Sequence, residues 1–235
     1  MTDGPHASDG DASPTHLLWT GGWDSTFRLL DLVLTERRPV RPCYLIDLRR
    51  RSTLHELRAM ARIRADIARL SPEAGQRIGT TTIVSAGELS RDPDLVARFH
   101  ALLARSYLGA QYVDLAQLAR QLDETPGRRV VWTLDPAHAD GDLGLFAGFR
   151  FPLLPLTKPE MLAIATREGF ARVLEQTWFC HTPTRGGRPC GVCAPCKYTI
   201  EEGLGRRVPW PGRAKHAARR IPGARWLYRR LVPER

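Results

Sequence analysis

The chain has 235 residues, of which 43% are hydrophobic and 26% are charged, values typical of a globular protein that buries a core without disulfides. No run of residues approaches the roughly 20 apolar residues of a membrane-spanning helix. The first residues carry neither the basic nor the apolar region of a secretory signal. These features argue against a membrane-spanning or secreted protein, and we expect a cytoplasmic one.

The formal net charge is +10, and it is concentrated at one end of the chain. Residues 206–235 hold ten Arg or Lys against one Glu, so the rest of the chain is close to neutral. We expect four segments: a disordered leader over 1–14, an α/β domain over 15–172, a cysteine module over 173–205 and a basic tail over 206–235.

Short β-like runs alternate with longer helical patterns, which is typical of a parallel sheet with crossover helices. The predicted strands are His16–Trp19, Cys43–Asp47, Thr80–Val84 and Val130–Thr133. Helical spacing of apolar residues predicts helices over Thr26–Glu36, His55–Leu70, 92–122 (as one or two helices) and from Thr157 to Glu168. The last of these has the sequence of a capping box, with Thr157 as the cap and Glu160 as its partner.

A glycine-containing loop, Thr20-Gly21-Gly22-Trp23-Asp24-Ser25, separates the first predicted strand from the first predicted helix. Two glycines let the backbone approach a ligand closely, and the start of the following helix favours an anion. The loop is neither a Walker A sequence nor GxGxxG. The alternative is an ordinary strand–helix turn in which Asp24 is the N-cap.

This loop resembles the SGGxDS loop of the PP-loop ATP pyrophosphatase superfamily, with Thr20 in place of the usual Ser. The segment Leu156–Met161 resembles the LTKxEI segment of the same superfamily, and the stretch from His55 to Ala61 resembles a third, looser one. The resemblance implies a doubly wound, mostly parallel five-stranded sheet of the adenine nucleotide alpha hydrolase type, with ATP and Mg²⁺ at the carboxyl ends of the strands.

The resemblance also assigns site residues. The implied ATP-binding residues are Thr20, Gly21, Gly22, Asp24, Ser25, Thr26 and Asp47. The implied catalytic residues are Asp24, Ser25 and Lys158, whose ammonium would neutralise charge on the phosphates. A lone histidine such as His55 is more often structural than catalytic.

Four of the five cysteines, Cys180, Cys190, Cys193 and Cys196, lie within one short segment. In a reducing compartment such a cluster indicates a metal site, and a closed four-sulfur shell indicates a structural Zn²⁺. An iron–sulfur cluster, as in some PP-loop enzymes that thiolate tRNA, is the alternative. The fifth, Cys43, lies in an apolar run and is expected to be a buried thiol.

The cysteine segment, TWFC followed by GGxPCGxCxxC, resembles the zinc motif of the 7-cyano-7-deazaguanine synthase family. That family adenylates a carboxylate or amide with ATP, releasing pyrophosphate and AMP, and captures the carboxylate with ammonia. Two departures weaken the deazapurine assignment: the loop Thr133–Asp142 lacks the family's Cys, Tyr and Arg, and residues 47–51 lack its DYGQRH-like run.

The basic tail interleaves Arg with Trp210, Trp226 and Tyr228. This composition suits nucleic acid, an anionic membrane surface or a solvated extension, and its prolines prevent one long helix.

Three functions therefore remain open: a C–N bond-forming ligase acting on a small carboxylate or amide with a nitrogen donor, an enzyme that adenylates a tRNA base, and a non-catalytic protein that binds ATP and zinc. A homodimer is one option for the assembly.

Overall fold

The computed structural model describes residues 14–47, 50–105, 111–123, 130–131, 145–146 and 149–220. Residues 1–13 of the expected leader lie outside these ranges. So do the loop Thr133–Asp142 and the part of the basic tail beyond residue 220.

The sheet is parallel, and its three longer strands are β1 (Thr15–Leu18), β2 (Val40–Ile46) and β3 (Thr82–Ser85). Two two-residue strands, β4 (Val130–Val131) and β5 (Phe149–Arg150), pair beyond β1, and the order is β3-β2-β1-β4-β5. In the register Leu17 lies opposite Pro42, and Cys43 lies opposite Thr82. The α/β class and the parallel sheet predicted from the sequence are confirmed.

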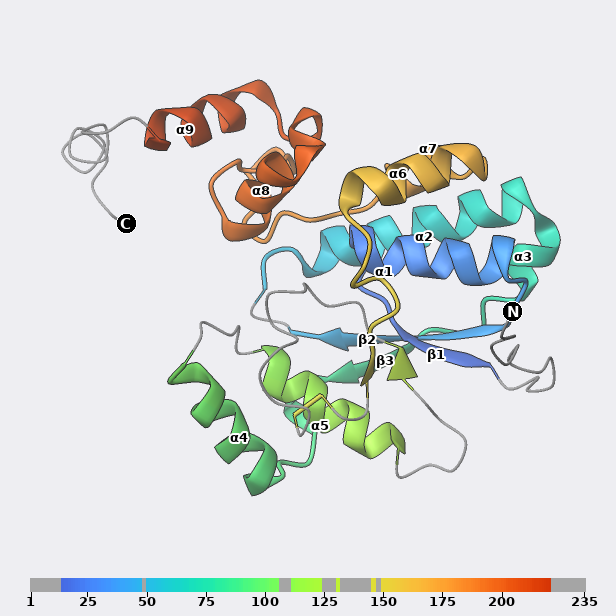
Figure 1. The fold of residues 1–235 in the computed structure, drawn as a ribbon, viewed down its shortest axis with the longest axis vertical. Helices are drawn as coiled ribbons and strands as arrows, with labels where there is room; N and C mark the ends of the chain where they lie inside the picture. Colours follow the sequence, from blue (N-terminus) through green and yellow to red (C-terminus); the bar gives the residue numbers. More distant parts are fainter. Residues whose placement is uncertain are drawn as a thin grey trace, which may run out of the picture.

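Helices cover both faces of the sheet (Figure 1). One face carries α1 (Trp23–Leu30) with its π-helical continuation η1 (Asp31–Thr35), α2 (Thr53–Leu70), α3 (Pro72–Gln76), α6 (Lys158–Arg167) and α7 (Ala171–Leu174). The other face carries α4 (Pro93–Leu103) and α5 (Gln111–Asp123), and a short 3₁₀ turn, η2 (Ala86–Glu88), follows β3.

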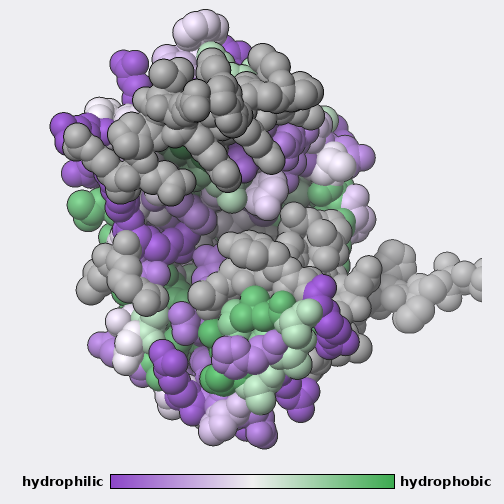
Figure 2. All heavy atoms as spheres, turned by 90° about the vertical axis from the view of Figure 1, so that its left-hand side faces the viewer, coloured by the Kyte–Doolittle hydropathy of each residue, from purple (hydrophilic) through white to green (hydrophobic). Residues whose placement is uncertain are grey.

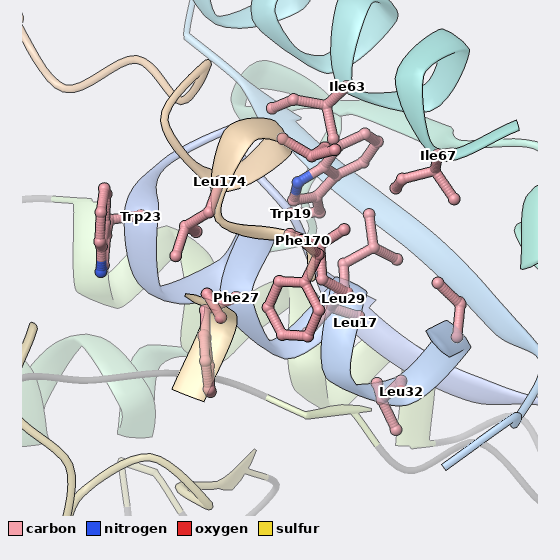
Figure 3. Packing of buried hydrophobic residues seen from close by; sticks show 14 of the residues in the cluster. Leu17, Trp19, Trp23, Phe27, Leu29, Leu32, Ile63, Ile67, Phe170 and Leu174 are labelled. Atoms are coloured by element: carbon pink, nitrogen blue, oxygen red, sulfur yellow. The ribbon is translucent and has the colours of Figure 1, made fainter. Parts of the chain in front are cut away.

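Each face of the sheet has its own apolar core. Successive side chains of a strand point to opposite faces of the sheet, so neighbouring residues of β1 belong to different cores. Leu17 lies in the first cluster and Leu18 in the second. The first cluster also holds Trp19, Trp23, Phe27, Leu29, Leu32, Ile63, Ile67, Phe170 and Leu174 (Figure 3). The second includes Cys43, which is buried as the sequence predicts.

The remaining C-terminal elements are α8 (Ala194–Thr199), the π-helical turn η4 (Ile200–Leu204), the 3₁₀ turn η5 (Gly205–Arg207) and α9 (Trp210–Arg220). They lie on the side toward which the arrow of β2 points (Figure 1). Viewed from that side, hydrophilic side chains are spread over much of the coloured surface, and a more apolar group lies toward the bottom of the view (Figure 2). Within the described ranges, no helix is long and apolar enough to cross a bilayer.

Candidate functional site

The glycine loop follows β1 and turns sharply at Gly21, whose φ is +68°. A side chain at this position would be strained, and a Cβ would lie 3.0 Å from Met60 Cγ and 3.1 Å from the Glu56 carbonyl oxygen. The backbone N–H of Trp178 donates a hydrogen bond to the Gly21 carbonyl at 2.8 Å. The loop is therefore packed on α2 and closed by a residue just before the first cysteine of the cluster.

Helix α1 begins directly after Gly22, which is its N-cap and has no side chain to cap the helix. Asp24 is therefore not the N-cap. The alternative of an ordinary turn gives its carboxylate that capping role, which the structure does not show. The unpaired N–H groups of a first helical turn carry partial positive charge and attract anions. The Ser25 side chain lies within this turn and donates to the Gly22 carbonyl at 3.5 Å.

The two threonines of the loop differ in what they can contact. Thr20 is exposed, and its hydroxyl oxygen accepts a hydrogen bond from Gly22 N–H at 3.4 Å. Thr26 is completely buried, and its hydroxyl oxygen accepts a hydrogen bond from the Trp19 indole N–H at 3.0 Å. Thr20 is thus accessible from solvent, whereas Thr26 packs α1 against Trp19, the residue directly after β1.

Lys158 reaches the start of α1 from the first residue of α6. The predicted capping box is present, with Thr157 accepting from Glu160 N–H and Glu160 accepting from Thr157 N–H. The Lys158 ammonium lies 3.5 Å from Asp24 Oδ2 and 2.8 Å from Glu202 Oε2. Burial lowers the pKa of Lys158, but the carboxylates of Asp24 and Glu202 outweigh it and raise the pKa above its ordinary value. Lys158 is therefore a fixed cation at neutral pH.

Asp47 directly follows β2, which neighbours β1 in the sheet, so both strand ends meet at the same edge. Its carbonyl oxygen accepts from Arg50 N–H at 3.0 Å and from the Thr53 hydroxyl at 2.9 Å. Asp47 thus shapes the loop into α2 beside the glycine loop.

A polar network behind this edge reaches the cysteine segment. The buried Glu56 carboxylate accepts from the hydroxyls of Tyr44 at 2.8 Å and Ser52 at 2.6 Å. Arg50 lies 3.7 Å from that carboxylate and 3.0 Å from His181 Nε2.

The His55 ring stacks on the Trp178 ring with centroids 4.4 Å apart. This contact gives His55 a packing role rather than a ligand position.

The four clustered cysteines bring their sulfur atoms within 4.8 Å of one another. The distance is 3.9 Å between Cys190 and Cys196 and also 3.9 Å between Cys180 and Cys193. Four sulfurs about 2.3 Å from one ion in a regular tetrahedron lie about 3.8 Å apart. The donor set and its spacing therefore fit a four-coordinate metal ion.

Backbone amides support these sulfurs. Cys180 Sγ accepts from Cys190 N–H at 3.2 Å, and Cys190 Sγ accepts from the N–H groups of Val192 at 3.4 Å and Cys193 at 3.3 Å. The contacts with Cys180 and Cys193 raise the pKa of the Cys196 thiol, whereas the contacts with Cys180 and Cys196 lower the pKa of the Cys193 thiol.

Gly191 forms the knuckle of this segment at φ +76°, and a Cβ there would lie 2.1 Å from Gly212 Cα. The start of α9 is thus in contact with the knuckle.

Sequence reasoning missed two residues after the cysteines, Glu202 and Arg207. The Arg207 guanidinium lies 4.9 Å from the Trp23 ring centroid and 5.1 Å from that of Phe179. It donates to the Thr177 carbonyl at 2.6 Å. Burial lowers the pKa of Arg207 to about 10, which leaves it charged at neutral pH. Neither residue belongs to a motif, and the one signal in the sequence is that both are charged and follow the cysteine cluster closely.

Comparisons with known proteins give no family for this chain. No family model matches the sequence, and a search of curated proteins found no match. The structure brings Lys158 into contact with Asp24, which precedes Ser25 in the glycine loop, and it brings the four cysteines together. The functional assignment therefore rests on these two constellations.

Proposed function

We propose that this chain is a PP-loop ATP pyrophosphatase that activates a carboxylate or amide as an adenylate and passes it to ammonia or another nitrogen nucleophile. The observation that carries the proposal is the 3.5 Å contact between Asp24 and Lys158 at the start of α1. The two residues are far apart in the sequence, and each belongs to a different motif of the superfamily.

The proposal includes the fold of that superfamily, a doubly wound five-stranded sheet. Its support is the strand order, in which β1 lies between β2 and β4, together with helices on both faces. In such sheets ligands bind beyond the carboxyl ends of the strands, at the point where the connections from two neighbouring strands run in opposite directions. The glycine loop and Asp47 both follow strands at that edge.

The proposed reaction has two steps. A carboxylate oxygen of the substrate attacks the α-phosphorus of ATP, and pyrophosphate leaves, which gives an acyl-adenylate. Ammonia then attacks the acyl carbon, the carbon–oxygen bond to AMP breaks, and the nitrogen loses a proton to give the amide. Both steps build charge on phosphate oxygens rather than on a protein nucleophile, so positioning and electrostatic stabilisation supply the rate enhancement.

The residues have the following proposed roles. Gly21 and Gly22 allow the backbone to approach the pyrophosphate, and the first turn of α1 with Ser25 donates to it. Lys158 neutralises the charge that develops on the leaving pyrophosphate. Asp24 holds Lys158 before ATP binds and can ligate Mg²⁺, which prefers carboxylate and phosphate oxygens.

We further propose that the cysteine cluster holds Zn²⁺ in a structural role. Four thiolates complete a tetrahedral shell and leave no position for substrate. Metal binding would then contribute to the free energy of folding of this segment. The proposal extends to a cytoplasmic location, where reduced thiols persist.

The test is phosphorus NMR of the zinc-loaded protein with ATP, Mg²⁺, ammonium and 7-carboxy-7-deazaguanine. AMP and pyrophosphate that appear only with all components support the ligase and the substrate class. ATP binding without AMP, with any substrate tried, would leave a non-catalytic nucleotide-binding protein and refute the enzyme.

A second candidate is adenylation of a tRNA base. The observation that favours it is helix α9, where Trp210 is 71% exposed and the exposed Arg213 and Lys215 follow on the same helix. Exposed aromatic rings and cations suit stacking on bases and contacts to phosphates. AMP release that requires tRNA, and is lost on removing residues 206–235, would favour this candidate over a small substrate.

A further inference from the structure

Lys158 has a second carboxylate partner, Glu202, which lies closer to it than Asp24 does. Its ammonium lies 2.8 Å from Glu202 Oε2 and 3.5 Å from Asp24 Oδ2. Glu202 follows the last cysteine of the cluster, whereas Asp24 and Lys158 belong to the α/β body. The lysine of the candidate phosphate site is therefore held by a carboxylate that the C-terminal elements supply.

The backbone fixes Glu202 in this position. Within η4 the chain leaves helical geometry at Glu202, with φ −85° and ψ 17°, and turns through Gly203 at φ +83°. A Cβ on Gly203 would lie 3.5 Å from Pro159 Cγ, so this turn packs on the residue directly after Lys158. Leu204 follows and is buried in the core cluster of the α1 face. Glu202 is thus held between an anchored leucine and the first turn of α6.

The segment that leads into the cysteines and the C-terminal elements each contact the glycine loop as well. The backbone N–H of Trp178 donates a hydrogen bond to the Gly21 carbonyl oxygen at 2.8 Å. Arg207 lies over the ring of Trp23, the residue between Gly22 and Asp24, and donates to the carbonyl of Thr177 at 2.6 Å. The loop, the lysine and the cysteine segment therefore form one connected unit.

We propose that Glu202 is a positioning residue that fixes the Lys158 ammonium beside the glycine loop, so that the C-terminal elements complete the phosphate site. A lysine side chain has four rotatable bonds, and the close ion pair with Glu202 restricts them. The catalytic part of this inference rests on the proposed function; the pairing of the two side chains does not.

The first test measures the pairing without any activity. The full-length, metal-loaded protein is treated with an amine-acetylating reagent at about pH 9, and mass spectrometry follows the rate at Lys158. Glu202→Gln removes a carboxylate that keeps the amine protonated, so acetylation of Lys158 should become about three- to tenfold faster. Glu202→Asp should restore part of the protection. Glu201→Gln is the matched control, because Glu201 lies 3.8 Å from His216 Nε2 instead.

The second test separates kcat from KM for AMP release. Glu202→Gln should lower kcat about tenfold with a small change in KM for ATP, since a misplaced catalytic group costs rate more than binding. Glu202→Asp should recover part of kcat, and Glu201→Gln should behave as the unmodified protein.

Each outcome decides one point. Equal acetylation rates in Glu202→Gln and Glu201→Gln would overturn the pairing. Faster acetylation with unchanged kcat would overturn the positioning role and leave a structural ion pair. If the unmodified protein releases no AMP with any substrate, the proposed function fails, and the acetylation rates still decide the pairing.

Discussion

The contact between Gly191 and Gly212 gives a prediction whose size follows from the structure. An alanine at position 191 would have two separate costs. Its backbone has φ +76°, a left-handed conformation that costs an L-residue about 1–2 kcal/mol. Its Cβ would also lie 2.1 Å from Gly212 Cα, a backbone atom that moves only with the whole of α9.

Forcing extra atoms into such a contact costs about 1–3 kcal/mol in other cores. Gly191→Ala should therefore lower the free energy of unfolding by about 2–5 kcal/mol. Because Cys190 and Cys193 flank the knuckle, the same substitution should weaken metal binding by moving their sulfurs out of tetrahedral spacing.

Two controls separate the two costs. Gly169 has φ +81°, and a Cβ added there would meet nothing within 4 Å, so Gly169→Ala carries only the backbone cost. Gly212→Ala carries the close contact without a left-handed φ, since its Cβ would lie 2.8 Å from Gly191 Cα. Helix propensity favours alanine there by about 1 kcal/mol, which offsets part of that contact.

The assay is urea unfolding of the metal-loaded proteins, with a zinc-competition titration beside it. We expect Gly191→Ala to be the most destabilised of the three and to lose zinc most readily. Equal losses of stability for Gly191→Ala and Gly169→Ala, with equal zinc affinity, would refute the close packing of α9 on the knuckle.

Three further predictions follow from the site. Asp24→Ala should lower AMP release about a hundredfold or more while the circular dichroism spectrum is retained, because Asp24 orients Lys158. The control, Asp31→Ala on the same helical run, should keep the activity. An Asp24→Ala protein that releases AMP at the unmodified rate would refute the assignment. Cys193→Ser should lower both metal content and melting temperature, whereas Cys43→Ala should keep its metal; a zinc-free Cys193→Ser protein of full stability would contradict the structural site. The raised pKa of Lys158 means that its pairing stabilises the fold fully below the pKa of an unfolded lysine, about 10.4, and is lost as pH rises through the higher folded pKa. Urea unfolding between about pH 8 and 11 should therefore show a steeper alkaline loss of stability in the unmodified protein than in Lys158→Met, and parallel curves would contradict the pairing.

Patterns between neighbouring residues predict most of the elements. The helix predicted over His55–Leu70 begins at Thr53 and ends at Leu70, and the predicted capping box at Thr157 is present. The sequence predicts one or two helices over residues 92–122, and the structure has two, α4 and α5. These features depend on hydrophobic periodicity and on capping, both of which are visible within a few residues.

Element boundaries are less predictable where no side chain marks them. Helix α1 begins at Trp23 rather than near Thr26, because Gly22 forms its N-cap through backbone geometry alone. The third strand, predicted over Thr80–Val84, lies at Thr82–Ser85. The short strand β5 (Phe149–Arg150) carries too few residues to show an alternating pattern.

The candidate site is predictable where a motif carries it and not elsewhere. The four cysteines cluster as their spacing predicts, and Asp24 and Lys158, which the resemblance assigns to one site, lie in contact. Glu202 and Arg207 escape prediction, because each meets its partners through the folded chain, far from its neighbours in sequence. The motif places Thr26 at ATP, yet its hydroxyl accepts from the Trp19 indole inside the protein.

The bond from Trp178 N–H to the Gly21 carbonyl sets an order on the folding of a newly made chain. Strands β1, β2 and β3 all leave the ribosome well before Trp178, so the sheet can begin to form while the glycine loop still lacks its closing bond. Contacts between distant parts of a chain form late, because closing a long loop costs entropy before the contact repays it. The loop should therefore reach its final shape only after the cysteine segment has emerged, and a nascent chain halted at α7 would carry the sheet with the glycine loop still unfinished.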